Sequence, residues 1–439
     1  MYVRMYVCMI HRGEGTKGYS LQFRHLEFTN ALATTSRETQ VSVDNNNTAS
    51  IKTDDITFED ATPTVDEFDD LYGAMQYVYT KNNKGGQRDI WEDQFAQATK
   101  RSSLVRETYN VIAVGDTYRE LAKNALIGND KVISEMIHPR NHTKAPSWCV
   151  RLRQYATNDN HKNARFGISK RSSMKKEKEA LKELKPLFEQ FHGPVKLRDP
   201  ECALYIFEGL NHANKVLVRK LDSGAATQSI APKTRECITR TPLCPLASFI
   251  MCNLGRVKEG DRVLDPYSGS CSTLLSSAMI APTSQSVGIE IAADDIVNRE
   301  KIMQDFESRG LVVPVQLIHG DCTDADVRDI ARNAVGNRAF DVILADPPYG
   351  RREKASKDQT PPLVKLVECI GADFRRGKPL LRKGGRLVAF VPTNEGEVVS
   401  SGLPSEIDLG RAGLELISVT EQPLSDTLSR WLVVFKCVR

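Results

Sequence analysis

The chain has 439 residues, which is enough for two domains because a single domain usually takes about 100 to 200 residues. Hydrophobic residues make up 40% of it and charged residues 26%, a balance that excludes both a disordered chain and a membrane-protein composition. The net charge of +4, from 60 basic and 56 acidic residues, neither requires nor excludes a nucleic-acid partner.

No apolar run approaches the ~20 residues that span a bilayer. The first ten residues lack the cleavage pattern of a signal peptide. We therefore expect a cytoplasmic protein that has no membrane segment. The ten cysteines include no C-x-x-C pair, so we expect reduced, mostly buried thiols and no metal site.

Residues 1–145 are predicted to form a diverged N-terminal region. Within it, about residues 35 to 70 are polar and then acidic, with eight Asp and Glu residues from Asp54 to Asp70 and no Lys or Arg among them. That composition is typical of a solvated loop or a disordered insertion.

Residues 146–225 are predicted to form a small α+β domain. Strands are expected at 148–153, 195–197, 203–208 and 215–220, and a helix at 174–191. The helix has leucines at helical spacing on one side and lysines, among them Lys175 and Lys176, over the rest of its surface. These lysines fit a solubilising helix face and an RNA-binding surface equally well.

After a linker at 226–240, residues 241–439 alternate short apolar strands with helical stretches. The strands are expected at 262–264, 287–289, 315–318, 340–344 and 385–391. This alternation predicts an α/β fold with a doubly wound sheet whose central strands are parallel. Two further strands, at 414–419 and 431–438, are predicted to form an antiparallel hairpin at its edge, which makes the sheet mixed.

The first of these strands runs through Asp265 into a turn that contains Gly269. In a doubly wound sheet, a nucleotide-like ligand binds at this point. Glu290 ends the next strand about 20 residues later, where an acidic side chain accepts hydrogen bonds from ribose hydroxyls. The turn has neither G-x-G-x-x-G nor a P-loop lysine, so we expect a ligand with ribose but no pyrophosphate, and S-adenosylmethionine fits.

Asp321 follows the third strand and is predicted to accept a hydrogen bond from the adenine amino group. Taken singly, such an aspartate is more often a helix cap. Its third place in an ordered series of acidic residues at strand ends favours the cofactor role.

Asp346, Pro347, Pro348 and Tyr349 directly follow the fourth strand. The two prolines restrict the backbone, so the Asp346 carboxylate and the Pro347 carbonyl are predicted to form a rigid acceptor pair for the exocyclic amine of a nucleobase. Tyr349 is predicted to stack on that base. A D-P-P run can also be a rigid turn with a capping aspartate, but its place after the cofactor strands favours catalysis. Cys244 stands in an apolar stretch without a catalytic partner, so we expect a buried residue there.

With these motifs, residues from about 190 to 439 resemble the THUMP-containing tRNA (guanosine-10, N2) methyltransferase catalytic subunits. The matching segments are 239–253, the loop with Asp265, Tyr267 and Gly269, the run 346–350 with Arg352 and Glu353, and residues 384–388 and 424–430. The resemblance implies a class I methyltransferase domain with a Rossmann-like sheet at 241–439, preceded by a THUMP-like RNA-binding domain at 146–225. It adds Tyr267 to the cofactor residues and Arg352 to the substrate-binding residues.

The resemblance also implies two partners. One is tRNA, bound mostly through its phosphates by six basic residues of the THUMP-like domain: Arg151, Arg153, Lys170, Arg171, Lys175 and Lys176. The other is a small zinc-binding activator subunit on the methyltransferase domain. One departure is clear: Cys271 stands where the family has a second glycine in its cofactor loop, which weakens cofactor binding if this position needs a positive φ.

Two other functions stay open on the residues alone. The D-P-P-Y loop suits an adenine N6 amine or another nucleobase amine as well as guanosine N2, and the basic α+β domain favours structured RNA as the substrate. A catalytically weak RNA-binding scaffold is the second alternative, because Cys271 departs from the family pattern and the N-terminal third is diverged.

Overall fold

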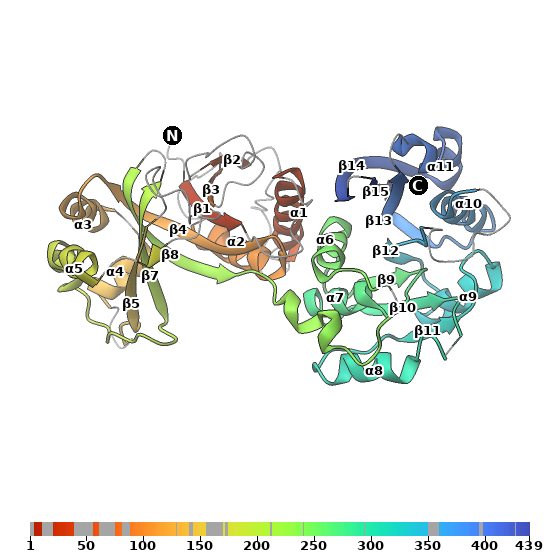
Figure 1. Ribbon diagram of the computed structural model, residues 1–439, viewed down its shortest axis with the longest axis horizontal. Coiled ribbons are helices and arrows are strands. Elements are labelled where there is room, and N and C mark those ends of the chain that lie inside the picture. Colours follow the sequence, from red (N-terminus) through yellow and green to blue (C-terminus); the bar gives the residue numbers. More distant parts are fainter. Residues whose placement is uncertain are drawn as a thin grey trace, which may run out of the picture. The chain divides into compact units, whose positions relative to one another are not determined.

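The computed structural model describes residues 4–10, 21–38, 56–60, 75–80, 88–128, 130–139, 144–154, 170–171, 174–210, 213–239, 241–293, 295–349, 360–394, 398–425 and 427–439. The chain divides into two compact units, which Figure 1 shows with their elements labelled. The first unit takes residues 1–12, 42–100 and 104–225, and the second takes 13–41, 101–103 and 226–439.

The first unit is built on an eight-stranded sheet of order β2-β3-β1-β4-β8-β7-β5-β6. All neighbouring strands are antiparallel except β5 and β7, which are parallel. The strands are β1 (Arg4–Ile10), β2 (Ile56–Asp60), β3 (Met75–Thr80), β4 (Val105–Gly115), β5 (Trp148–Gln154), β6 (Lys170–Arg171), β7 (Cys202–Leu210) and β8 (Ala213–Ser223).

Four helices accompany this sheet: α2 (Arg88–Arg101), α3 (Tyr118–Ile127), α4 (Lys131–Ile137) and α5 (Met174–Phe188). Helix α5 buries Ala180, Leu184 and Leu187. These three residues lie on one side of the helix because they are spaced by three or four positions. They join the core that α3, α4 and strands β5, β7 and β8 share.

The strands and the helix expected between 146 and 225 are confirmed, apart from 195–197, where Val195 makes only an isolated bridge to Trp148. Strand β2 falls inside the acidic stretch that we expected to be a loop, while most of the rest of that stretch lies outside the described residues. The sheet joins strands from 1–145 to strands from 146–225. Position 145 is therefore not a boundary between compact units.

The second unit is built on a seven-stranded sheet of order β11-β10-β9-β12-β13-β15-β14. Strands β11, β10, β9, β12 and β13 are parallel, and β15 and β14 are antiparallel. The strands are β9 (Arg262–Asp265), β10 (Gln285–Glu290), β11 (Gln316–His319), β12 (Phe340–Ala345), β13 (Leu381–Asn394), β14 (Leu414–Ser425) and β15 (Leu428–Cys437). The strand order reverses between β9 and β12, so the predicted doubly wound mixed sheet is confirmed.

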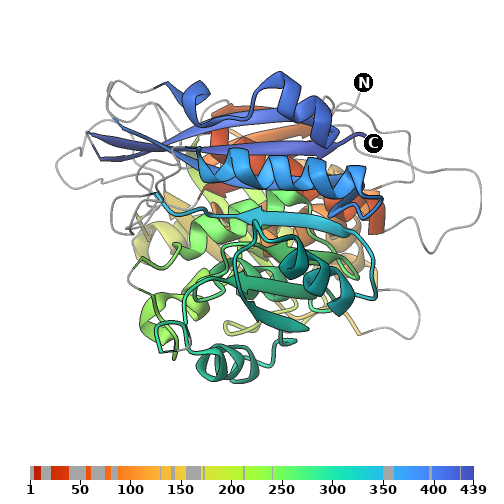
Figure 2. The same ribbon diagram turned by 90° about the vertical axis from the view of Figure 1, so that its right-hand side faces the viewer.

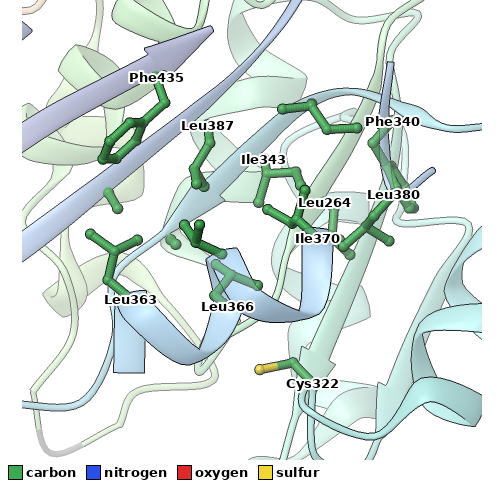
Figure 3. Close-up of a cluster of buried hydrophobic side chains, with 14 of the residues drawn as sticks. Leu264, Cys322, Phe340, Ile343, Leu363, Leu366, Ile370, Leu380, Leu387 and Phe435 are labelled. Atoms are coloured by element: carbon green, nitrogen blue, oxygen red, sulfur yellow. The ribbon is translucent and has the colours of Figure 1, made fainter. Parts of the chain in front are cut away.

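Helices cover both faces of this sheet. They are α6 (Pro245–Gly255), α7 (Ser272–Ile280), α8 (Arg299–Glu307), α9 (Ala325–Ala334), α10 (Pro362–Arg375) and α11 (Glu406–Ala412), with 3-10 turns η4 (Thr227–Ile230), η5 (Pro232–Thr234) and η6 (Val399–Gly402). Figure 2 shows α10, in blue, lying along the strands. Its Leu363, Leu366 and Ile370 pack onto a buried cluster that includes Ile343 and Leu387 of the sheet (Figure 3).

Helix α1 (Leu21–Glu38) belongs to the second unit, although the sequence places it in the diverged N-terminal region. Its buried Glu27 accepts hydrogen bonds from the Ser103 amide at 2.7 Å and from the Asn253 side chain of α6 at 3.0 Å. Arg101 donates to the other end of Asn253 at 2.8 Å. Residues 21–38 and 101–103 thus complete one face of the second unit.

Within the described ranges, none of the helices combines the length and the apolar character needed to cross a membrane.

Candidate active site

Four acidic residues lie at the carboxyl ends of four neighbouring parallel strands. Asp265 ends β9, Glu290 ends β10, Asp321 is the second residue after β11, and Asp346 directly follows β12. Because these strands are adjacent and parallel, their carboxyl ends meet at one edge of the sheet. The structure therefore brings together the four residues that the sequence suggested.

The buried Asp265 shapes the turn after β9. One carboxylate oxygen accepts the Tyr267 amide at 2.9 Å, and the other accepts the Thr273 hydroxyl of α7. Burial, together with the nearby Asp346 and Glu290 carboxylates, raises the pKa of Asp265 to about 7. Because Asp265 is buried beneath the turn that it holds, it acts on a ligand mainly through the backbone of that turn.

Glu290 joins β10 to the same turn. Its two carboxylate oxygens accept the backbone N–H groups of Gly269 and Ala292, each at 2.7 Å. A carboxylate has about four acceptor positions, so two remain for the hydroxyls of a ribose. Gly288, on the same strand, has no room for a side chain, since a Cβ atom there would lie 2.9 Å from Ser268 and from Leu317.

Tyr267 and Asp321 differ in exposure. Tyr267 is half-buried, and its hydroxyl donates to the Pro362 carbonyl at the start of α10 at 3.2 Å. Asp321 is exposed, and one of its oxygens accepts from both the amide and the hydroxyl of Thr323 at 2.8 Å. The helix cap of α9 is Asp324 instead. The alternative interpretation of Asp321 as a helix cap is therefore wrong.

Cys271 stands at the N-cap of α7 with φ 61° and ψ 35°, in the left-handed region. Its side chain is fully buried. The family's second glycine, which Cys271 replaces, would therefore stand at a position with a positive φ. Glycine adopts this conformation freely, and other residues adopt it at a cost of about 1–2 kcal/mol.

Exchanging Cys271 tests this backbone cost. We expect Cys271→Gly to be more stable than Cys271→Ala by about 1 kcal/mol, because only glycine avoids the left-handed penalty. Both variants lose the buried sulfur and differ only at the Cβ atom, so their difference gives the backbone cost less the contribution of one buried methyl group. Thermal unfolding followed by circular dichroism measures it, and equal stability of the two variants would contradict the assignment.

Arg235, in the predicted linker, supports the turn after β9. This buried side chain donates to the Ser270 carbonyl and, at 2.9 Å, to the Ser272 hydroxyl, on either side of Cys271. It also forms a buried ion pair with Asp305 of α8, with Nε and Oδ2 3.6 Å apart. Sequence reasoning missed Arg235, because a lone arginine in a polar segment gives no local signal.

The loop after β12 carries the predicted acceptor pair. Asp346 is half-buried and Pro347 is buried, whereas Pro348 is exposed. The Tyr349 hydroxyl donates to Asp346 Oδ1 at 2.8 Å. Burial raises the pKa of Asp346 above its ordinary value, which makes it a better proton acceptor near neutral pH.

Tyr349 is half-buried, and Arg430 of β15 donates to its hydroxyl at 3.2 Å. In this structure the tyrosine is thus bonded within the site, and its stacking on a base stays a prediction. Arg352 and Glu353 lie outside the described residues.

The six basic residues predicted to bind RNA come from β5, β6 and α5 of the first unit. Arg153 lies opposite Arg171, and Gln154 lies opposite Lys170, where β5 and β6 pair. Lys175 and Lys176 are exposed in the first turn of α5. The structure therefore pairs Arg153 with Arg171, which lies 18 positions later in the sequence.

Two of these arginines, Arg151 and Arg153, also contact other residues of the first unit. Arg151 is exposed, and it donates to the Leu197 carbonyl at 3.0 Å and to the Tyr205 hydroxyl at 3.3 Å. The Arg153 guanidinium lies 4.9 Å from the centre of the Tyr205 ring. Both side chains are held in place by Tyr205, which sequence reasoning did not single out.

The cysteines of the described ranges are free thiols, most of them buried. Cys244, expected to be buried, is half-buried and directly precedes Pro245 at the start of α6. In the same ranges, no three His, Cys, Asp or Glu side chains are grouped in a way that would hold a metal ion.

No protein-family model matches the chain. Among curated proteins, the chain is 28% identical over 57% of its length to the tRNA (guanine(10)-N(2))-methyltransferase TRMT11 of Gallus gallus. It is 29% identical over 60% of its length to the protein of that name from Xenopus laevis. The alignments span 61% of each relative. Among solved structures, TrmN from Thermus thermophilus is 16% identical, with 99% of this chain and 100% of that chain covered and a TM-score of 0.40.

Proposed function

We propose that this protein transfers a methyl group from S-adenosylmethionine to the exocyclic N2 amine of a guanosine, at position 10, in tRNA. The observation that carries the proposal is the place of Asp346 and Pro347 at the end of β12, at the same sheet edge as Glu290 and Asp321. Relatives named tRNA (guanine(10)-N(2))-methyltransferase support the choice of nucleobase and of RNA.

The donor set at the sheet edge fits S-adenosylmethionine. Glu290 keeps two acceptor positions for the ribose hydroxyls, and the exposed Asp321 has one oxygen outside its bonds to Thr323. Tyr267 and Gly269 lie on the turn after β9, where the Gly269 amide donates to Glu290. When bound, the cofactor supplies an already activated methyl group on sulfur.

The chain's own residues then have to orient the amine. Asp346 and the Pro347 carbonyl accept its two N–H hydrogens, which directs the nitrogen lone pair toward the methyl carbon. The N–C bond forms as the C–S bond breaks, and Asp346 accepts the proton that the amine loses, helped by its raised pKa. Positioning is the main contribution, because the methyl group needs no further activation.

The basic residues of β5, β6 and α5 are proposed to bind the tRNA phosphates. Lys175 and Lys176 lie in the first turn of α5, where cations oppose the helix dipole. Their position therefore costs helix stability and favours a role in binding an anion. Backbone N–H groups at a helix N-terminus add to such a site.

Charge reversal tests this surface. We expect the double change Lys175→Glu with Lys176→Glu to weaken tRNA binding and to reduce the slope of log K against log salt by about 1 to 2, since each phosphate contact contributes about 0.7 to 0.9. The matched control is Lys182→Glu with Lys185→Glu, the same charge change at exposed positions farther along the helix. Filter binding at several salt concentrations measures both, and a slope equal to that of the control would remove these lysines from the interface.

We also propose the small zinc-binding activator subunit as a partner of the second unit, and a cytoplasmic location. The main experiment therefore uses the chain alone and the chain copurified with this partner. Mass spectrometry of nucleosides from tRNA treated with each preparation should show N2-methylguanosine at position 10. Methylation of adenine N6 would support the other amino-methyltransferase. No product together with no cofactor binding in calorimetry would support the RNA-binding scaffold.

A further inference from the structure

Arg430 of β15 contacts the loop after β12, residues 346–349, from another part of the sheet. Its side chain is 7% exposed. Its Nη1 donates to the Tyr349 hydroxyl at 3.2 Å, and its Nε donates to Gln422 Oε1 on β14 at 2.7 Å. The guanidinium carbon lies 3.9 Å from the centre of the Phe390 ring on β13. Contacts to two other strands, β13 and β14, and to the loop therefore fix this arginine.

The register of the sheet explains why these groups meet. Arg430 lies opposite Gln422 on one side and opposite Pro392 on the other. Phe390 is two residues before Pro392, so it points to the same face of β13. Regular strands hold a side chain more precisely than a loop does, and Arg430 is thus a rigid support for Tyr349 and, through it, for Asp346.

The direction of the hydrogen bonds follows from their chemistry. A guanidinium has donors only, so the Tyr349 oxygen must accept from Arg430. The hydroxyl hydrogen is then free to point at Asp346 Oδ1, 2.8 Å away. This leaves Asp346 Oδ2 as the oxygen for a ligand.

We propose that Arg430 is a positioning residue that acts through the Tyr349 hydroxyl to orient the Asp346 carboxylate for the substrate amine. The inference rests on the proposed function in one respect, the identity of Asp346 as the amine acceptor. It does not depend on which nucleobase carries the amine.

The charges around Asp346 give the proposal a measurable signature. Burial raises the pKa of Asp346, whereas the Arg430 cation and the Tyr349 hydroxyl lower it. The Asp265 carboxylate on β9 lies close enough for the two like charges to interact. Loss of the Arg430 cation should therefore raise the pKa of Asp346 further, and the active, ionised form would be lost at a higher pH.

The test compares Arg430→Gln, which removes the charge, with Arg430→Lys, which keeps it. We expect Arg430→Gln to lower kcat about 10- to 100-fold at pH 7 and to move the acid limb of the pH profile up by about one unit. Arg430→Lys should keep the limb near that of the wild type. The control Lys436→Met removes a cation from the same face of β15, three pleats away, and should change neither quantity.

Two further measurements keep the outcomes separate. Tyr349→Phe removes the connecting hydroxyl but keeps the ring, and it should also move the acid limb upward, even if Arg430→Gln does not fold. Infrared difference titration, with Asp346→Asn to assign the carboxyl band, reports the pKa of Asp346 without any activity. An unmoved pKa in both Arg430→Gln and Tyr349→Phe overturns the inference. Absence of methyl transfer by the wild type overturns the proposed function alone.

Discussion

Replacing Asp346 by alanine should lower kcat for tRNA methylation by about 10²- to 10⁴-fold, the usual contribution of a positioned acid or base. The change removes the carboxylate that accepts the amine hydrogen and takes its proton. It should leave tRNA affinity nearly unchanged, because affinity comes mainly from phosphate contacts elsewhere. Single-turnover methylation with labelled cofactor, together with filter binding, measures both quantities.

The isosteric variant Asp346→Asn separates shape from charge. It keeps one carbonyl oxygen beside Pro347, so we expect its kcat to lie between those of the wild type and the alanine variant. A kcat for Asp346→Ala within threefold of the wild type would remove Asp346 from the chemistry. Equal loss of tRNA binding and of kcat would instead indicate that the variant has misfolded.

Replacing Glu290 by alanine should raise the Kd for S-adenosylmethionine by about 10- to 100-fold, because one hydrogen bond to a charged group contributes about 1.5–3 kcal/mol. The variant loses the acceptor of the ribose hydroxyls. It also leaves the Gly269 and Ala292 amides without the carboxylate that they contact at 2.7 Å. Isothermal titration calorimetry measures the Kd, and kcat at saturating cofactor should fall much less.

The control Glu290→Gln keeps one carbonyl oxygen and should bind the cofactor with intermediate affinity. S-adenosylhomocysteine, which has the same ribose but no methyl group, should show the same order of affinities across the variants. An unchanged Kd in Glu290→Ala would place the ribose away from β10.

The buried Arg235, which pairs with Asp305 and donates to the Ser270 carbonyl, shows that the turn after β9 is supported by residues outside its own motif. Asp305 also accepts the backbone amides of Glu236 and Cys237, at 2.9 and 3.1 Å. Residues 235–237 therefore pack against α8 and against the turn after β9, and they are part of the second unit. The turn proposed to bind the cofactor thus depends on a residue 35 positions before Ser270.

By itself the sequence determined the doubly wound sheet and the order of its acidic residues. Both depend on local patterns: short apolar runs make strands, and a residue that directly follows a run lies at the strand's carboxyl end. Asp265, Glu290, Asp321 and Asp346 could be predicted together for this reason. The D-P-P-Y run was informative because two prolines restrict the backbone wherever it folds.

Only the tertiary structure decided which distant residues support that site. Arg430 meets Tyr349 across 81 positions of the chain, and Glu27 of α1 meets Asn253 across 226. Such pairs depend on strand register and on helix packing, and neither leaves a periodic signal in the sequence. The same holds for the backbone at Cys271. From the sequence it was open whether this position has a positive φ, and the structure shows that it does, in a turn held by Asp265 and Arg235.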